Sequence, residues 1–307
     1  MVRGKSIGQK MQPLAFLSPA LISIFILSFL PIVYTVYIAF TNYNLNHLDD
    51  FHFIGLDNFK EIITGDFRNE FTAVFGWNLA FALIVTLGCF SIGLFLAILL
   101  NNPDMKETRI YRSLLIVPWA LPATIAILSW QGLYNESYGG INGLLKMLHL
   151  PSEIPWLSEP FWSRLAIIIT TLWLGFSYMM NLSLGILQSI DPALYEAAIV
   201  DGANIWQKFR YITLPGITYA SIPILITSFS YNFNQFGAAY LITLGGPPRA
   251  DAQYAGYTDI LASTGFKMTT TFFKYDVSAA LSIVLFVIIG VITVINMKYT
   301  KAFEEVD

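Results

Sequence analysis

The chain has 307 residues, of which 55% are hydrophobic and only 12% are charged, and its net charge is −3. Soluble domains carry about 25% charged residues, so this composition excludes an ordinary soluble protein and favours one embedded in lipid. The single cysteine, Cys89, excludes a disulfide within the chain. The net charge is weak evidence about any partner, and no nucleic-acid partner is expected.

Six stretches, each at least 21 residues long, lack Asp, Glu, Lys and Arg. About 20 apolar residues suffice to cross a bilayer as a helix, so we predict an all-α membrane protein with six transmembrane helices. The first apolar segment is about twice as long as a secretion signal's apolar region and is interpreted as a retained anchor. The predicted helices cover roughly 14–41, 74–101, 110–134, 163–190, 216–244 and 277–298.

Prolines in the first and third predicted spans are expected to disturb the helix. We expect a kink at Pro31 in the first helix, whereas Pro118 and Pro122 both fall in the third. Proline is tolerated in a span where neighbouring groups or water satisfy the freed carbonyls. The third helix is therefore expected to line an interior space.

The basic residues predict the orientation. With six spans and an internal N-terminus, the cytoplasmic segments hold ten of the 17 Lys and Arg residues, although the outer loops are longer in total. Positive charge favours the cytoplasmic side, so both termini are predicted to be cytoplasmic. The predicted cytoplasmic basic residues are Arg3, Lys5, Lys10, Lys106, Arg109, Arg112, Lys208, Arg210, Lys298 and Lys301.

The predicted organisation divides the chain after the first outer loop. Residues 1–13 form a cytoplasmic N-terminus and 14–70 the first transmembrane helix with its outer loop. Residues 71–299 hold a core of five transmembrane helices with a cytoplasmic loop at 191–215, and 300–307 form a cytoplasmic tail.

The first two outer loops each contain a distinctive segment. Loop 42–72 ends in a predicted short surface helix, and the second loop contains the mildly amphipathic INGLLKMLHL. In the first loop, four side chains could bind a metal ion, although a solvated loop is the simpler interpretation. These side chains are His47, Asp49, Asp50 and His52.

Loop 191–215 begins with a strong helix signal. Asp191 can cap a helix whose first residue is Pro192. Two alanines on one face of that helix leave a shallow surface where the backbone of a partner can approach. The residues that share this face, at i, i+3, i+4 and i+7, are Leu194, Ala197, Ala198 and Asp201.

The rest of this loop is expected to be rigid. Gly202 allows a sharp turn, NIWQKFRYI forms a second short helix, and Pro215 starts the next span. An ordinary loop tucked under the bundle is one interpretation. This arrangement favours a loop that transmits movement of a cytoplasmic partner to the adjoining spans.

Energy-coupling and catalytic motifs are absent from the sequence. There is no G-x-x-x-x-G-K-[ST] loop to hold ATP. No acid or base lies well inside a span, whereas ion-coupled carriers usually need one. We therefore expect no enzyme activity and no cofactor in this chain, with ATP and magnesium held by a partner.

Two predicted helices carry polar rows without charge, and such rows commonly hydrogen-bond neighbouring helices. Amides, hydroxyls and aromatic rings together instead favour a neutral polyhydroxylated solute, because rings stack on sugar C–H surfaces and amides pair with hydroxyls. The row on the fifth helix is Ser228, Tyr231, Asn232 and Gln235, and that on the fourth is Thr170, Trp173, Ser177 and Asn181.

Loop 191–215 also contains a specific motif. Glu196-Ala197-Ala198 precede Asp201-Gly202-Ala203, followed by Phe209, Ile212, Leu214 and Pro215. This pattern resembles the EAA loop of permease subunits of bacterial ABC importers, which docks into a cleft of an ATPase subunit. The resemblance implies ATPase coupling through Glu196, Ala197, Ala198, Asp201 and Gly202.

From about residue 70 onward, the chain resembles the larger permease subunit of maltose/maltodextrin importers. The segments that carry the resemblance are GLYNESYGGIN, WLGFSYMM, SYNFNQF, LGGPPR and AGYTDILAS. Ala123 and Thr171 replace more strongly hydrogen-bonding types, which leaves sugar length and identity open. The resemblance implies sugar contacts at Trp119, Ala123, Thr171, Trp173, Leu174, Gly175, Ser228, Tyr231, Asn232 and Gln235.

The resemblance implies a type I permease subunit in a bacterial cell membrane that imports maltose or maltodextrin. Its expected partners are a second homologous permease subunit, two ATP-binding cassette ATPase subunits and an extracytoplasmic sugar-binding protein. Two alternatives remain, which are the same machinery for another oligosaccharide or polyol and a stand-alone facilitator.

Overall fold

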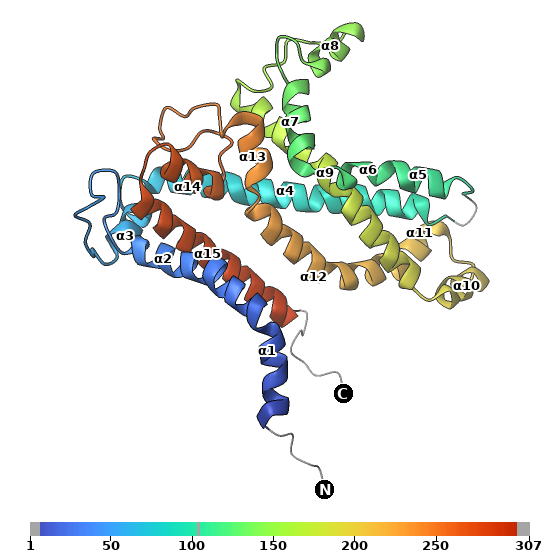
Figure 1. Ribbon diagram of the computed structural model, residues 1–307. Coiled ribbons are helices and arrows are strands. Elements are labelled where there is room, and N and C mark those ends of the chain that lie inside the picture. The colour runs from blue at the N-terminus through green and yellow to red at the C-terminus, as the bar shows by residue number, and fades with distance from the viewer. Residues whose placement is uncertain (1–6, 103–104, 300–307) are drawn as a thin grey trace.

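The computed structural model describes residues 7–102 and 105–299, whose regular secondary structure is helical, as expected (Figure 1). The predicted tail 300–307 and residues 1–6 of the predicted N-terminus lie outside the described residues. Within these described ranges, five helices are long and apolar enough to cross a membrane. They cover Phe16–Ala39, Arg68–Leu100, Pro160–Ser189, Ile205–Thr243 and Tyr275–Lys298.

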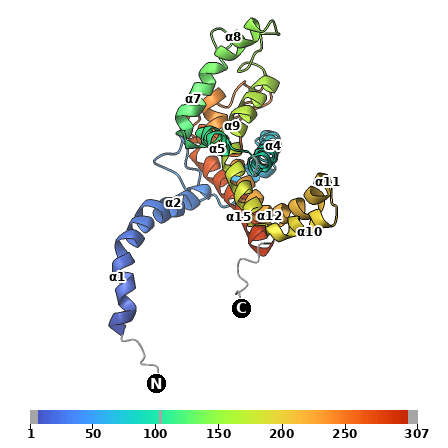
Figure 2. The ribbon, with the colours of Figure 1, turned by 90° about the vertical axis from the view of Figure 1, so that its right-hand side faces the viewer.

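The first span is built from α1 (Ile7–Ile24), the π-turn η1 (Phe25–Phe29) and α2 (Leu30–Ala39). The wider turn ends two residues before Pro31, which cannot donate the usual helical hydrogen bond. Figure 2 shows α1 standing away from the bundle, whereas α2 packs beside α15 (Tyr275–Tyr299).

The core of the bundle is α4 (Arg68–Leu100), which follows the short helix α3 (Asp57–Ile63) predicted in the first loop. It packs along α9 (Pro160–Ser189) and crosses α12 (Leu214–Phe233). At Gly93 the two main chains approach so closely that a Cβ would lie 2.6 Å from the backbone nitrogen of Met180. A side chain at position 93 would therefore separate α4 from α9.

The third predicted span, 110–134, is not one helix. It is divided into α5 (Thr108–Leu115), α6 (Val117–Ala120) and α7 (Ala123–Leu133). Leu121 is extended, with φ −78° and ψ 145°, because a residue before proline is disfavoured in helical conformation and Pro122 follows. The continuous helix expected from hydropathy is therefore wrong in this region.

The fifth predicted span, 216–244, is also interrupted. After α10 (Pro192–Val200), α11 (Ile205–Lys208) and the π-turn η2 (Phe209–Thr213), α12 runs only to Phe233. Asn234 and Gln235 form a break before α13 (Phe236–Thr243).

A side chain of α4 holds this break. Asn78 is fully buried, and its Nδ2 donates to the carbonyl of Phe233 at 2.8 Å. Its Oδ1 accepts from the N–H of Leu261, the first residue of α14 (Leu261–Thr270), at 2.9 Å. One amide thus satisfies the end of one helix and the start of another.

The loop 245–260 between α13 and α14 is fixed by α4 and α9. The buried carboxylate of Glu70 accepts the N–H groups of Gln253, Tyr254 and Ala255 at 2.8, 2.8 and 2.5 Å. Arg164 Nε donates to the carbonyl of Tyr257 at 2.9 Å. The loop is therefore a structured cap on this end of the bundle, next to α14.

We predict that Glu70→Ala loosens this loop, because three backbone N–H groups lose their acceptor and each such loss costs about 1–3 kcal/mol. Trypsin should cleave after Arg249 at least about tenfold faster, since 1.4 kcal/mol corresponds to a factor of ten. Asp57→Ala, which breaks only the exposed Lys60–Asp57 pair, is the control. Equal cleavage rates for Glu70→Ala and the parent protein would contradict this role of the carboxylate.

Candidate functional site

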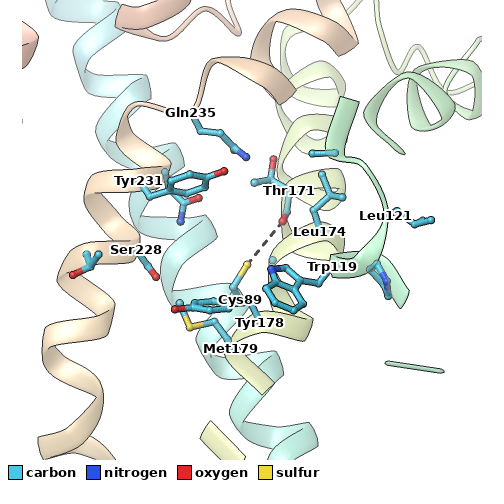
Figure 3. Close-up of a pocket in the computed structure, with 15 residues that line it drawn as sticks. Cys89, Trp119, Leu121, Thr171, Leu174, Tyr178, Met179, Ser228, Tyr231 and Gln235 are labelled. Atoms are coloured by element: carbon cyan, nitrogen blue, oxygen red, sulfur yellow. Dashed lines mark hydrogen bonds between the residues drawn. The ribbon is translucent and has the colours of Figure 1, made fainter. Parts of the chain in front are cut away.

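A cavity of about 450 Å³ lies between α4, the broken third span, α9 and α12 (Figure 3). It brings together nine of the ten predicted sugar contacts, which come from three different predicted helices. These nine residues are Trp119, Ala123, Thr171, Leu174, Gly175, Ser228, Tyr231, Asn232 and Gln235.

The break in the third span forms one wall. Figure 3 shows Trp119 and Leu121 on the side of the cavity opposite Ser228 and Tyr231. The Trp119 ring lies 6.0 Å from that of Tyr178 on α9, and 55% of the Trp119 surface is exposed. Pro118 belongs to this wall, so the proline-interrupted segment lines an interior space as expected.

The opposite wall comes from α12 and its break. Ser228, Tyr231 and Asn232 lie on α12, but Gln235 lies beyond its end, in an extended conformation with ψ 95°. The expectation that all four share one continuous helix face is thus wrong. All four still line the cavity, because the chain turns back towards it at the break.

Hydrogen bonds within the protein hold two polar side chains of the lining. The Thr171 hydroxyl donates to the carbonyl of Ile167 at 2.7 Å, and Asn232 Nδ2 donates to Thr86 Oγ1 at 2.9 Å. Among the described residues, no Asp, Glu, Lys, Arg or His lines the cavity. The site therefore suits an uncharged ligand that forms hydrogen bonds.

Trp173, the tenth predicted contact, lies outside the lining. Its ring packs edge-on against Trp130 of α7 at 5.6 Å. Each residue of α9 is rotated by about 100° from the one before it, so the cavity is lined by neighbouring positions such as Leu174 and Tyr178. The role of Trp173 as a sugar contact stays a prediction.

The polar row predicted on the fourth helix bonds the broken third span instead. Thr170 Oγ1 lies 3.3 Å from the Tyr134 hydroxyl, and Ser177 Oγ donates to the carbonyl of Leu115 at 2.6 Å. Asn181 Oδ1 accepts from Arg112 Nε at 3.3 Å. Contacts between helices, the alternative considered for this row, account for these three residues.

Sequence reasoning missed several lining residues. Tyr178 and Met179 follow Gly175 by three and four positions, so helical spacing could have identified them. Cys89 comes from α4, and only the packing of α4 on α9 reveals it. The additional lining residues are Cys89, Pro118, Leu121, Tyr178, Met179 and Thr227.

A second feature, the helical loop of α10 and α11, lies at the other end of the molecule from α3 and α14 (Figure 1). Asp191 accepts the N–H of Ala193 at 2.9 Å, which confirms the predicted cap. Gly202 has φ +75°, the left-handed conformation that favours glycine. The predicted coupling residues are exposed except Ala198, which is partly buried.

This loop is bonded to the start of α12. The Tyr195 hydroxyl lies 2.9 Å from the Thr213 hydroxyl, which joins α10 to η2.

The His and Asp side chains of the first outer loop form only a pair, with His47 Nδ1 3.2 Å from Asp50 Oδ1. The described part of the chain contains no group of three or more metal-ligating side chains.

Residues 90–300 match the family described as binding-protein-dependent transport system inner membrane component. The chain belongs to this family. Members are permease components of ABC transporters, so the helical bundle and its cavity are those of a multi-pass membrane permease.

Curated relatives extend the match beyond the family segment. The chain is 40% identical to the galactooligosaccharides transport system permease protein GanP of Bacillus subtilis (strain 168), over 92% of this chain and 69% of GanP. It is 39% identical to the maltodextrin transport system permease protein MalC of Streptococcus pneumoniae (serotype 4 strain), over 99% of this chain and 72% of MalC.

A bacterial alginate ABC transporter, solved in complex with an alginate pentasaccharide-bound periplasmic protein, shares the fold. Its matching chain superposes with a TM-score of 0.78 at 21% identity, over 97% of each chain. The likeness shows that the arrangement of helices is that of an ABC transporter permease.

We predict that Gly175→Ala destabilises the bundle, because the new Cβ would lie 2.6 Å from Cys89 Sγ. Overpacking of this kind costs about 1–3 kcal/mol, measurable as a lower midpoint of thermal unfolding in detergent. Cys89→Ala should restore most of the loss in the double variant. A double variant no more stable than Gly175→Ala would show that Cys89 is not the obstacle.

Proposed function

We propose that this chain is the transmembrane permease subunit of an ATP-driven importer that translocates maltodextrin delivered by an extracytoplasmic binding protein. The observation that carries the proposal is the uncharged cavity, in which amide and hydroxyl side chains line the wall together with aromatic ones. The relatives named for maltodextrin and galactooligosaccharide transport support a neutral sugar.

The cavity favours neutral over acidic sugars. The alginate transporter imports an acidic polysaccharide, and a buried anion needs a positive partner or strong donors. The described lining has no Lys, Arg or His that could pair with a carboxylate. A neutral galactooligosaccharide is the second candidate, because GanP is as similar as the maltodextrin permeases.

We further propose that α5, α6 and α7 together form a sixth span. With 11 residues, α7 covers about 16 Å at 1.5 Å per residue, roughly half of a hydrocarbon core. The preceding α5 and α6 would cover the other half. Six spans would put both termini on the same side of the membrane, and the distribution of Lys and Arg favours the cytoplasmic side for them and for α10 and α11.

The exposed cavity walls support a second homologous permease subunit as a partner. Trp119 and Tyr231 line the site, yet 55% and 67% of their surfaces are exposed. A large aromatic ring on a solute pathway is best covered on its other side by protein. Two such subunits would enclose the solute between them.

The cytoplasmic loop is proposed to dock onto the ATPase subunits, which would hold ATP and magnesium. Glu196, Ala197 and Asp201 are exposed on α10 and its end. The Tyr195–Thr213 hydrogen bond then connects the docked helix to α12, which carries Ser228 and Asn232. Movement of α10 is thereby linked to the cavity wall.

The function is tested by maltodextrin uptake into proteoliposomes that contain the whole transporter and its binding protein. Asn232→Ala should lower the uptake rate about tenfold, because a lost hydrogen bond and an unpaired buried partner cost about 1–3 kcal/mol. An acidic oligosaccharide should not compete, and this chain alone should carry no sugar. Uptake by the isolated chain would instead indicate a facilitator.

We predict that Gly202→Asp uncouples ATP hydrolysis from transport while the spans still insert. A non-glycine residue at φ +75° is strained by about 1–2 kcal/mol, and the new carboxylate stands beside Asp201. A Cβ at position 202 would meet no other atom within 4 Å, so local crowding plays no part.

The measurements are ATPase stimulation by the sugar-loaded binding protein and co-purification of the ATPase subunit. Gly185→Ala is the matched control, because a Cβ there also meets nothing within 4 Å but the residue lies in the regular helix α9. Parental values for Gly202→Asp in both measurements would mean that the loop does not couple the ATPase subunits to transport.

A further inference from the structure

The carboxamide of Asn232 in the cavity wall is held from another helix. Its Nδ2 donates to Thr86 Oγ1 of α4 at 2.9 Å. Both side chains are buried, with 8% of Asn232 and 3% of Thr86 exposed. Thr86 itself is absent from the cavity lining. It therefore acts on the site only through Asn232.

The two ends of a carboxamide differ chemically. The oxygen only accepts hydrogen bonds, whereas the nitrogen only donates them. Rotation by half a turn about the last side-chain bond exchanges the two ends with little change in shape. A threonine hydroxyl can both donate and accept, so Thr86 can bond either end of the amide and thereby anchor it.

The main chain around Asn232 is already fixed. The carbonyl of the next residue, Phe233, accepts from the buried Asn78 of α4 at 2.8 Å. The end of α12 thus has a defined position relative to α4, and rotation of the amide is the remaining freedom. The contact with Thr86 removes it.

We propose that Thr86 is a positioning residue of the solute site, which anchors the Asn232 amide in the cavity wall. The proposal rests on the proposed function of the cavity. Asn232 Oδ1 receives no hydrogen bond from any described residue, although the side chain lines the cavity.

An anchored amide presents a hydrogen-bonding group to the solute at a fixed position. Without the Thr86 hydroxyl, the buried amide loses its partner on α4 and can turn away from the solute. Thr86 therefore acts on one hydrogen bond in the site without touching the solute.

A merely structural role for Thr86, as packing between α4 and α12, gives different expectations. Thr86→Val keeps the shape but removes the hydroxyl, whereas Thr86→Ser keeps the hydroxyl but removes the methyl group. Positioning depends on the hydroxyl and packing depends on the methyl group. The two substitutions therefore separate the two roles.

The experiment measures maltodextrin uptake by the complete transporter in proteoliposomes at increasing concentrations of sugar-loaded binding protein. Thr86→Val should lower the maximal rate about three- to tenfold, the effect of one net hydrogen bond. The half-saturating concentration of binding protein should not change, because docking is untouched. Thr86→Ser should stay within about twofold of the parent rate.

Two further variants complete the test. In the double variant Thr86→Val/Asn232→Ala, uptake should be no slower than in Asn232→Ala alone, because Thr86 acts only through Asn232. Thr72→Val is the matched control on the same helix, since the exposed Thr72 hydroxyl bonds only the carbonyl of Arg68. It should keep the parent rate. If Thr86→Val does not assemble, Thr86→Ala should show the same loss.

The proposal is overturned if Thr86→Val transports at the parent rate. It is also overturned if Thr86→Ser is as damaged as Thr86→Val, or if the two losses multiply in the double variant. In each of these cases a slow Asn232→Ala would leave the proposed function standing. Full uptake by Asn232→Ala would instead remove the cavity as the solute site, and the role of Thr86 with it.

Discussion

The hydrogen-bonding demand of main chain inside a membrane is the constraint on which this structure depends. In lipid, each carbonyl freed by a broken helix needs a partner from the protein or from water. Here the partners are side chains of intact helices. Ser177 of α9 donates to the carbonyl of Leu115 at the end of α5, and Asn78 of α4 donates to that of Phe233 at the end of α12. The breaks, and the cavity between them, exist because α4 and α9 can satisfy them.

The same demand divides the polar residues of the spans into two groups. Thr170, Ser177 and Asn181 are engaged by the broken third span and hold it in place. The oxygen of Asn232 has no partner among the described residues, although the side chain lines the cavity. Polar side chains in a span thus serve the fold first. Only the groups that the fold leaves unpaired indicate the ligand, and in this cavity they are uncharged.

The sequence predicted the features that depend on local chemistry. Four long spans, the Asp191 cap and the turn at Gly202 follow from composition and from residue types at fixed spacing. The division of the third span and the break at Gln235 did not follow, because each depends on a donor from a distant helix. The resemblance to known permeases located most of the cavity. It could not show that Cys89 packs closely against Gly175, since this contact arises from the packing of α4 on α9.

The cavity wall and the helical loop are parts of one continuous element. From Ile205 the helix runs through η2 and α12 to Phe233, a distance of about 43 Å at 1.5 Å per residue. One end is bonded to α10 through Tyr195 and Thr213, and the other meets α4 through Thr86 and Asn78. If the loop end is displaced while α4 stays with α9, the strain falls on the bonds between α12 and α4. Loss of the Thr86 contact would release the Asn232 amide from α4. Movement of the loop would thereby change the position of a hydrogen-bonding group in the cavity wall.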